Sequence, residues 1–319
     1  MEDVLTTPPL PLAEWLSVVE REYLSEFVPA GGAAVKFAIL DGDTVDTAAD
    51  CLARLGQAQN MLRVHVDAGR TRIHLAHELF FTIARALPWG SLLQRYLEEL
   101  FSAHAYPWPR PGVMMALADL AAAFAVAPNL LSRHLDQWLT ADLWDDRRLA
   151  QDFRAAMLWL CLSRLEPDGE DRAELVVQWL CGEKVAPTSL RMADISVRIS
   201  RTNARPMLVS LCHFLRKAGA SGLLVVLDVR QLSRAAPAEG TLRYSPAAVM
   251  DSYEVLREII DDAEHLPGLL IAVLAEAALA TGDSRRALSQ YAALQMRVWP
   301  DVRPGDRQNP VAPLVWLAA

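Results

Sequence analysis

The pattern of hydrophobic and polar positions changes period several times along the chain. Apolar residues recur at helical spacing over 12–28, which is typical of an amphipathic helix. The mostly apolar run 34–40 and the alternating run 62–67 are short enough to be strands instead. The N-terminal pattern therefore predicts helices at 12–28, 44–59 and 74–87, strands at 34–40 and 62–67, and a turn at Asp41-Gly42-Asp43.

No strand pattern occurs from Trp89 to about Leu190, where leucine and tryptophan recur at helical spacing between prolines. Strand patterns return later, each one after a helix. The C-terminal part predicts helices at 206–218 and 252–266 and strands at 222–228 and 268–274. Helices alternating with buried strands indicate a parallel sheet with crossover helices. We therefore expect one α/β domain with a large all-helical insertion, divided as 1–88, 89–190 and 191–319.

Composition narrows the classes of protein that the chain can belong to. Of its 319 residues, 52% are hydrophobic and 22% charged, so the chain can bury a sizeable core. The net charge of −8 argues against broad binding to nucleic acid. The longest apolar run, near 113–126, is too short to cross a bilayer, and residues 1–11 do not resemble a secretory signal. We expect a cytoplasmic protein without a membrane contact.

Several motifs follow one another in the second half of the chain. They are Trp179-Leu180-x-Gly182-Glu183, the arginines 198, 201 and 205, the run LLVVLD ending at Asp228, Tyr253-x-x-Leu256-Arg257-x-x-Ile260-Asp261, and Tyr291-x-x-Leu294-x-x-Arg297 before NPVAPLVWL. This order resembles the ATP-binding domain family of bacteriophage-exclusion (BREX) defence systems, a branch of the P-loop ATPases. The resemblance implies an AAA+-like parallel sheet and a nucleotide site.

The phosphate-binding loop that the resemblance implies is degenerate in this chain. A P-loop places Gly-x-x-x-x-Gly-Lys-Ser/Thr directly after the first strand, so that backbone N–H groups and the lysine hold the phosphates. Here that place holds Asp41, Gly42, Asp43 and Thr44, with Asp46 beyond. Only three of the 31 basic residues are lysines, and none lies between positions 36 and 184. Each carboxylate close to a triphosphate would cost about 1–4 kcal/mol.

The second acidic motif is also incomplete. The resemblance implies that Asp228 would hold Mg²⁺ through water and that the next residue would be a catalytic carboxylate. That next residue is Val229, which cannot orient a water molecule. We therefore expect an ATPase-like fold that is not an enzyme and has no cofactor, with binding of ATP and Mg²⁺ disfavoured.

Other residues are candidates for contacts rather than catalysis. Arg198, Arg201 and Arg205 could contact phosphate or a partner, or pair with surface acids. Trp108 and Arg110, in a proline-rich segment, are candidate exposed anchors of an interface. The histidines 65, 74 and 77 do not have the spacing of a zinc motif, and the four scattered cysteines are expected to be free thiols, so no metal site is predicted.

Three hypotheses follow for the function. The first is a non-catalytic, P-loop-derived subunit of an antiphage defence system that scaffolds or regulates partners such as a helicase, nuclease or ATPase subunit. The second is a weak nucleotide binder, or an ATPase that a partner completes. The third is a nucleic-acid-binding module, against which the net charge of −8 argues, so that nucleic acid would be contacted only indirectly.

Overall fold

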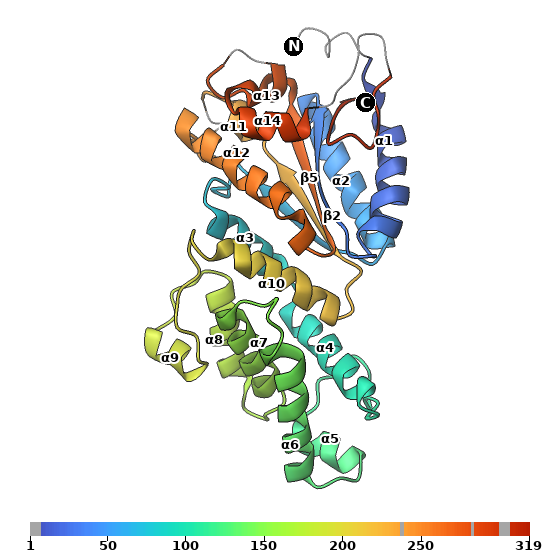
Figure 1. The fold of residues 1–319 in the computed structure, drawn as a ribbon, viewed down its shortest axis with the longest axis vertical. Coiled ribbons are helices and arrows are strands. Elements are labelled where there is room, and N and C mark those ends of the chain that lie inside the picture. The colour runs from blue at the N-terminus through green and yellow to red at the C-terminus, as the bar shows by residue number, and fades with distance from the viewer. Residues whose placement is uncertain (1–7, 237–238, 282–283, 300–306) are drawn as a thin grey trace. The chain divides into compact units, whose positions relative to one another are not determined.

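The computed structural model describes residues 8–236, 239–281, 284–299 and 307–319 (Figure 1). The chain forms two compact units. The first contains residues 1–83 and 220–319, and the second contains residues 84–219. Compact units need not be independently folding domains, so the expected domain boundaries at 88 and 190 stay predictions.

The first unit is built on a six-stranded sheet in which every pairing is parallel. The strand order is β1-β6-β2-β5-β4-β3. The strands are β1 (Leu10–Pro11), β2 (Ala33–Leu40), β3 (Leu62–Asp67), β4 (Leu223–Asp228), β5 (Leu269–Glu276) and β6 (Leu314–Ala318). The predicted α/β class with a parallel sheet is confirmed. The sequence pattern missed β1, a short edge strand, and β6, a short strand that pairs with β1 on one side and β2 on the other.

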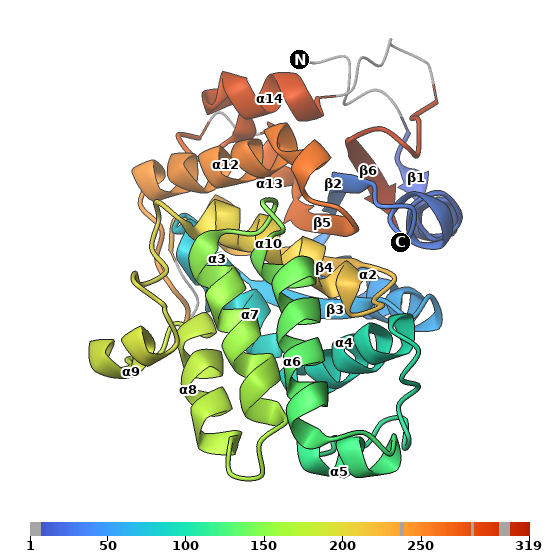
Figure 2. The same cartoon turned by 60° about the horizontal axis from the view of Figure 1, so that its bottom comes forward.

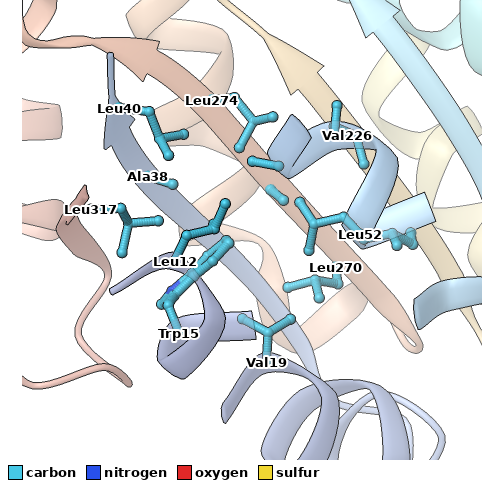
Figure 3. Packing of buried hydrophobic residues seen from close by; sticks show 14 of the residues in the cluster. Leu12, Trp15, Val19, Ala38, Leu40, Leu52, Val226, Leu270, Leu274 and Leu317 are labelled. Carbon is cyan, nitrogen blue, oxygen red and sulfur yellow. The ribbon is translucent and has the colours of Figure 1, made fainter. Parts of the chain in front are cut away.

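One face of the sheet packs against the N-terminal helices. These are α1 (Leu12–Val18), its π-helical continuation η2 (Val19–Phe27) and α2 (Gly42–Ala58). Trp15, Val19 and Leu52 contribute to one buried cluster with alternate residues of the strands, such as Ala38 and Leu270 (Figure 3). Successive strand residues point to opposite faces, so this cluster covers one side of the sheet only.

The strand residues that point to the opposite face of the sheet are buried as well. Phe37 in β2 and Val225 in β4 have no exposed surface. Helix α12 (Pro246–Asp261) contacts β2, and α14 (Ala292–Val298) packs on α12 (Figures 1 and 2). An all-parallel sheet needs both faces covered, which explains why its strands read as continuous apolar runs.

One predicted helix start is wrong by more than a turn, and one predicted turn is part of a helix. Helix α12 begins at Pro246 rather than at residue 252, because the Ser245 hydroxyl accepts a hydrogen bond from the Ala248 N–H (3.1 Å) and proline suits the first helical position. Helix α2 begins at Gly42, so the predicted turn at 41–43 is absent and Asp41 alone connects β2 to α2. This short connection decides the geometry of the site below.

The second unit is helical, as the sequence predicted for its region. Its helices are α4 (Trp89–Ala103), α5 (Leu117–Ala123), α6 (Pro128–Leu139) with its π-helical continuation η3 (Thr140–Trp144), α7 (Gln151–Arg164), α8 (Glu170–Leu180), α9 (Pro187–Met192) and α10 (Ala204–Lys217), and α3 (Ala76–Ala86) leads into it. Helices α7 and α8 lie side by side (Figure 2). Within the described residues, no helix is long and apolar enough to cross a membrane.

Lys36 is buried in β2, with 2% of its surface exposed. Its ammonium donates hydrogen bonds to the carbonyl oxygens of Val311 (2.5 Å) and Ala312, and lies 3.3 Å from the Tyr23 hydroxyl. The lysine therefore fixes the segment that leads into β6. Desolvation lowers its pKa from 10.5 to about 7.

The Lys36→Met variant is expected to lose one component of the pH dependence of stability. The unfolded chain keeps the lysine proton up to about pH 10.5, whereas the folded chain releases it near pH 7. Between these values the unfolded state holds more protons, so the free energy of unfolding rises with pH, by at most about 1.4 kcal/mol per unit. Urea unfolding from pH 7 to about 8.5, where tyrosines stay protonated, measures the slope, and the cysteines that titrate in this range contribute equally to the parent, the variant and the control. The exposed Lys184→Met variant is the control, and an unchanged slope in Lys36→Met would contradict the prediction.

Candidate functional site

A row of carboxylates lies at the carboxyl edge of the sheet. Strands β3, β4 and β5 end at Asp67, Asp228 and Glu276, and Asp41 follows the last residue of β2. The strands are in register, with Asp67 opposite Asp228 and Glu276 opposite Leu40. Because parallel α/β proteins bind ligands at the carboxyl edge of the sheet, this edge is the candidate functional site.

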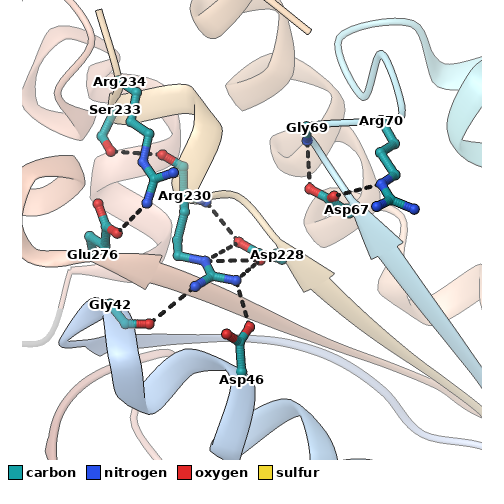
Figure 4. A network of polar contacts seen from close by, with 10 residues as sticks. All are labelled: Gly42, Asp46, Asp67, Gly69, Arg70, Asp228, Arg230, Ser233, Arg234 and Glu276. Carbon is teal, nitrogen blue, oxygen red and sulfur yellow. Dashed lines mark hydrogen bonds and ion pairs between the residues drawn. The ribbon is translucent and has the colours of Figure 1, made fainter. Parts of the chain in front are cut away.

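Arg230 occupies the middle of this edge (Figure 4). Its Nη2 lies 2.6 Å from Asp228 Oδ2 and 2.6 Å from Asp46 Oδ1, and its Nε lies 3.0 Å from Asp228 Oδ2. Its Nη1 donates to the carbonyl oxygen of Gly42 (3.1 Å). One guanidinium therefore links the end of β4 to the first turn of α2.

The contacts of Arg230 differ in strength because their burial differs. The Asp228 side chain is 8% exposed and that of Arg230 is 20% exposed, so this pair is held away from most of the solvent. The hydrogen bond to Asp228 is the main cause that raises the pKa of Arg230. The Asp46 side chain is 72% exposed, and water screens its pairing with the arginine. The Asp228–Arg230 pair is thus the central interaction of the edge.

The neighbouring carboxylates of the row also have partners. Glu276 Oε1 accepts a hydrogen bond from Arg234 Nη2 (2.9 Å). Asp67 Oδ1 accepts from the backbone N–H of Gly69 (2.6 Å), and Asp67 Oδ2 lies 3.7 Å from Arg70 Nε. Side chains of the same chain therefore compensate three of the four strand-end acids.

The residues predicted to form a degenerate nucleotide loop are part of a helix start. Asp41 is extended and exposed, and its carbonyl accepts from the Thr44 N–H (2.9 Å). Gly42 and Asp43 already belong to α2. A phosphate loop needs several consecutive residues whose N–H groups surround the anion, and one linking residue cannot provide them. Arg230 contacts two of the predicted site residues, Gly42 and Asp228, and so joins them.

Arg230 is not among the predicted site residues, because a catalytic carboxylate is expected directly after Asp228. The residue at that position, Val229, is 1% exposed, and its N–H donates to the Leu274 carbonyl (2.9 Å). Arg230 begins the short helix α11 (Arg230–Ser233), and its own N–H donates to Asp228 Oδ1 (3.0 Å). The only signal in the sequence is an arginine two positions after an acidic strand end.

The candidate phosphate or partner contacts lie in the second unit. Arg198, Arg201 and Arg205 are all exposed, just before and at the start of α10. Their loop is ordered by Asn203, whose Oδ1 accepts from the Ser200 N–H (2.6 Å) and whose Nδ2 donates to the Arg198 carbonyl (3.2 Å). Asp228 belongs to the first unit, so the three arginines and Asp228 lie in different units.

The expectation that Trp108 is an exposed anchor is wrong. Its side chain is 7% exposed, its indole donates to the Val113 carbonyl (3.0 Å), and its ring packs edge-on against Phe101. Arg110 is exposed, and its role in an interface stays a prediction.

The described part of the chain contains no cluster of metal-binding side chains. Within it, no group of three His, Cys, Asp or Glu residues is placed to hold a metal ion. The four cysteines are free thiols, and Cys51 is only partly buried. Burial raises the pKa of Cys181 to about 11 and of Cys212 to about 12, which keeps these thiols protonated and unreactive near neutral pH.

The later motif residues form a structural network between α12 and α14. Arg257 pairs with Glu254 (2.6 Å) and Asp261 on its own helix, and Arg297 Nη2 donates to Asp261 Oδ2 (2.9 Å). The Tyr291 hydroxyl donates to Glu254. These contacts, led by Arg257, lower the pKa of Glu254 to about 2. The motif thus attaches α14 to α12.

Fold and site together define a parallel α/β protein in which an internal arginine closes the carboxyl edge. The chain belongs to the family described as BREX system ATP-binding protein BrxC/D, whose model matches residues 130–319, more than half of the chain. The resemblance inferred from the motifs is confirmed, and the protein is a component of a phage-defence system with partners in that system. No curated protein and no solved structure matches the chain.

Removing Arg230 is expected to destabilise the fold. The Arg230→Met variant leaves the Asp228 carboxylate buried and unpaired, which costs about 3–5 kcal/mol. Asp46→Asn should cost at most about 1 kcal/mol, because that carboxylate is exposed. Urea unfolding measures both. The double variant Asp228→Asn/Arg230→Met should recover part of the loss, whereas an Arg230→Met variant as stable as the parent would contradict the central role of this pair.

Proposed function

We propose that the protein is a non-catalytic, P-loop-derived subunit of its BREX system, which scaffolds or regulates partner proteins instead of hydrolysing ATP. A helicase, a nuclease or an ATPase subunit of the same system would be the partner. The observation that carries the proposal is the closed carboxyl edge: one residue connects β2 to α2, and Arg230 links Asp228 to Gly42 and Asp46.

The topology supports a P-loop origin. From β2 the chain crosses over β5 and β4 to reach β3, whereas β4, β5 and β6 follow in the opposite direction across the sheet. The adjacent strands β2 and β5 therefore form a topological switch point, the place where open α/β sheets bind their ligands. The closed edge lies at this switch point.

The carboxylates at this edge repel a nucleoside triphosphate. Asp41, Asp43 and Asp46 lie at the start of α2, where the phosphates would be placed. Each close contact with a phosphate charge opposes binding by about 1–4 kcal/mol. Arg230 could offset part of this repulsion, but its guanidinium is already engaged by Asp228 and Asp46.

A magnesium ion would have to compete with the arginine. Both carboxylate oxygens of Asp228 accept hydrogen bonds from Arg230. Displacing the guanidinium would leave an arginine charge without its buried partner, so the ion gains little overall. The position after Asp228 carries the buried side chain of Val229, which cannot activate water. Arg230 therefore disfavours the binding of Mg²⁺, and Val229 disfavours hydrolysis.

Calorimetric titration of the full chain with ATP and Mg²⁺ should show no binding at millimolar nucleotide. Because the proposed role needs no hydrolysis of ATP, removing a strand-end carboxylate should not impair defence. The Glu276→Gln variant, which keeps the shape of the side chain, should protect cells against phage as well as the parent does. Plaque counts in a host that carries the complete defence system measure this. Micromolar ATP binding by the isolated chain would overturn the proposal, and binding only in the presence of a partner would indicate a partner-completed ATPase.

A tagged copy of the chain in a host that carries the complete defence system should co-purify with another protein of that system, at a fixed ratio and in buffer of moderate salt. Membership of the family implies such partners. Mass spectrometry of the purified material identifies them. Recovery of the chain alone would contradict the scaffold role, and recovery of DNA whose amount falls steeply with salt would favour direct nucleic-acid binding instead.

A further inference from the structure

A pocket of about 510 Å³ opens on the first unit, away from the closed edge. It is lined by Glu22, Tyr23, Glu26, Phe27, Ala30 and Val311. Five of these residues lie in η2 or just after it, and the sixth precedes β6, which lies beside α1 (Figure 2). Two segments far apart in the sequence thus build one site. This pocket is called the Phe27 pocket below.

The apolar surface of the Phe27 pocket is held in place from behind. A side chain at Gly32 would lie 2.5 Å from the Phe27 ring, so the ring rests directly on the backbone at that glycine. The Tyr23 ring meets Phe27 edge to face, with centroids 6.0 Å apart. Lys36 contacts the Tyr23 hydroxyl from the interior. Phe27 nevertheless stays 46% exposed and Val311 42% exposed.

The winding of η2 puts acidic and aromatic side chains together. The Val28 N–H donates to the Tyr23 carbonyl five residues earlier (2.9 Å), and the Ser25 hydroxyl donates to the Glu20 carbonyl. Glu22 and Glu26 are one turn apart, as are their neighbours Tyr23 and Phe27. Such π-helical turns are rare and often occur at functional sites.

The charge of the pocket favours a cation. Among the described residues, no ion pair is formed by Glu26, and Glu22 pairs with the exposed Arg21 (2.8 Å). A carboxylate beside an aromatic face binds a cation through charge and through the ring quadrupole. An anion would be repelled, and a purely apolar group would leave the carboxylates without a partner.

We propose that the Phe27 pocket binds an arginine side chain of a partner protein. A guanidinium can stack on the Phe27 ring while its N–H fork donates to the carboxylates of Glu22 and Glu26, and its aliphatic stem can pack on Val311. An ammonium offers no flat face for the ring. That the arginine belongs to a partner protein rests on the proposed function. The ability of the pocket to bind an arginine side chain does not, because it is tested on the isolated chain.

The test is a titration of the methyl-labelled full chain with N-acetyl-arginine methylamide, followed by NMR. The methyl signals of Ala30 and Val311 should shift and saturate in the millimolar range. The citrulline analogue, which has the same shape without the charge, should bind at least about fivefold more weakly. The double variant Glu22→Gln/Glu26→Gln and the variant Phe27→Leu should each weaken binding of the arginine probe by about three- to tenfold.

The matched control is Glu264→Gln, which removes an exposed carboxylate of the same unit outside the pocket and should bind the probe like the parent. Unchanged methyl spectra away from the pocket establish that each variant is folded. Equal shifts with the citrulline analogue, no shifts at all, or full binding by the folded Glu22→Gln/Glu26→Gln variant would each overturn the proposal. None of these outcomes depends on ATP binding or on the identity of the partner.

Discussion

The buried carboxylate of Asp228 must be neutralised, and the rest of the carboxyl edge is arranged around that requirement. The residue ends a central strand of an all-parallel sheet and is 6% exposed, so an unpaired charge there would be costly. Arg230 supplies the opposite charge from two residues away and reaches Gly42 and Asp46 as well. The Asp228–Arg230 ion pair thus neutralises the buried end of β4, and the same arginine attaches the start of α2 to it.

The same pair stabilises the carboxyl edge with residues of the chain itself. The Arg230 guanidinium bridges the end of β4 and the start of α2. Other motif residues also stabilise structure: Glu254, Arg257 and Asp261 attach α12 to α14 through Tyr291 and Arg297. The motifs that identify the family therefore maintain its fold here.

With the edge closed, the features that can recognise other molecules lie on the surfaces of the two units. The Phe27 pocket combines exposed apolar and acidic groups on the first unit. The ordered loop with Arg198 and Arg201 presents positive charge on the second. The acidic pocket would favour a positively charged ligand and the basic loop a negatively charged one.

The sequence by itself determined the parallel α/β class, four of the six strands and the absence of a phosphate-binding lysine, because apolar periodicity and residue inventory are local properties. It also identified Asp228 as the residue at the critical strand end. Only the tertiary structure decided that α2 begins at Gly42, that Trp108 is buried, and that Arg230 neutralises Asp228. A helix start depends on capping, burial depends on packing between segments, and the contacts of a long side chain with Gly42 and Asp46 depend on which strands are neighbours. None of these can be deduced from spacing along the chain.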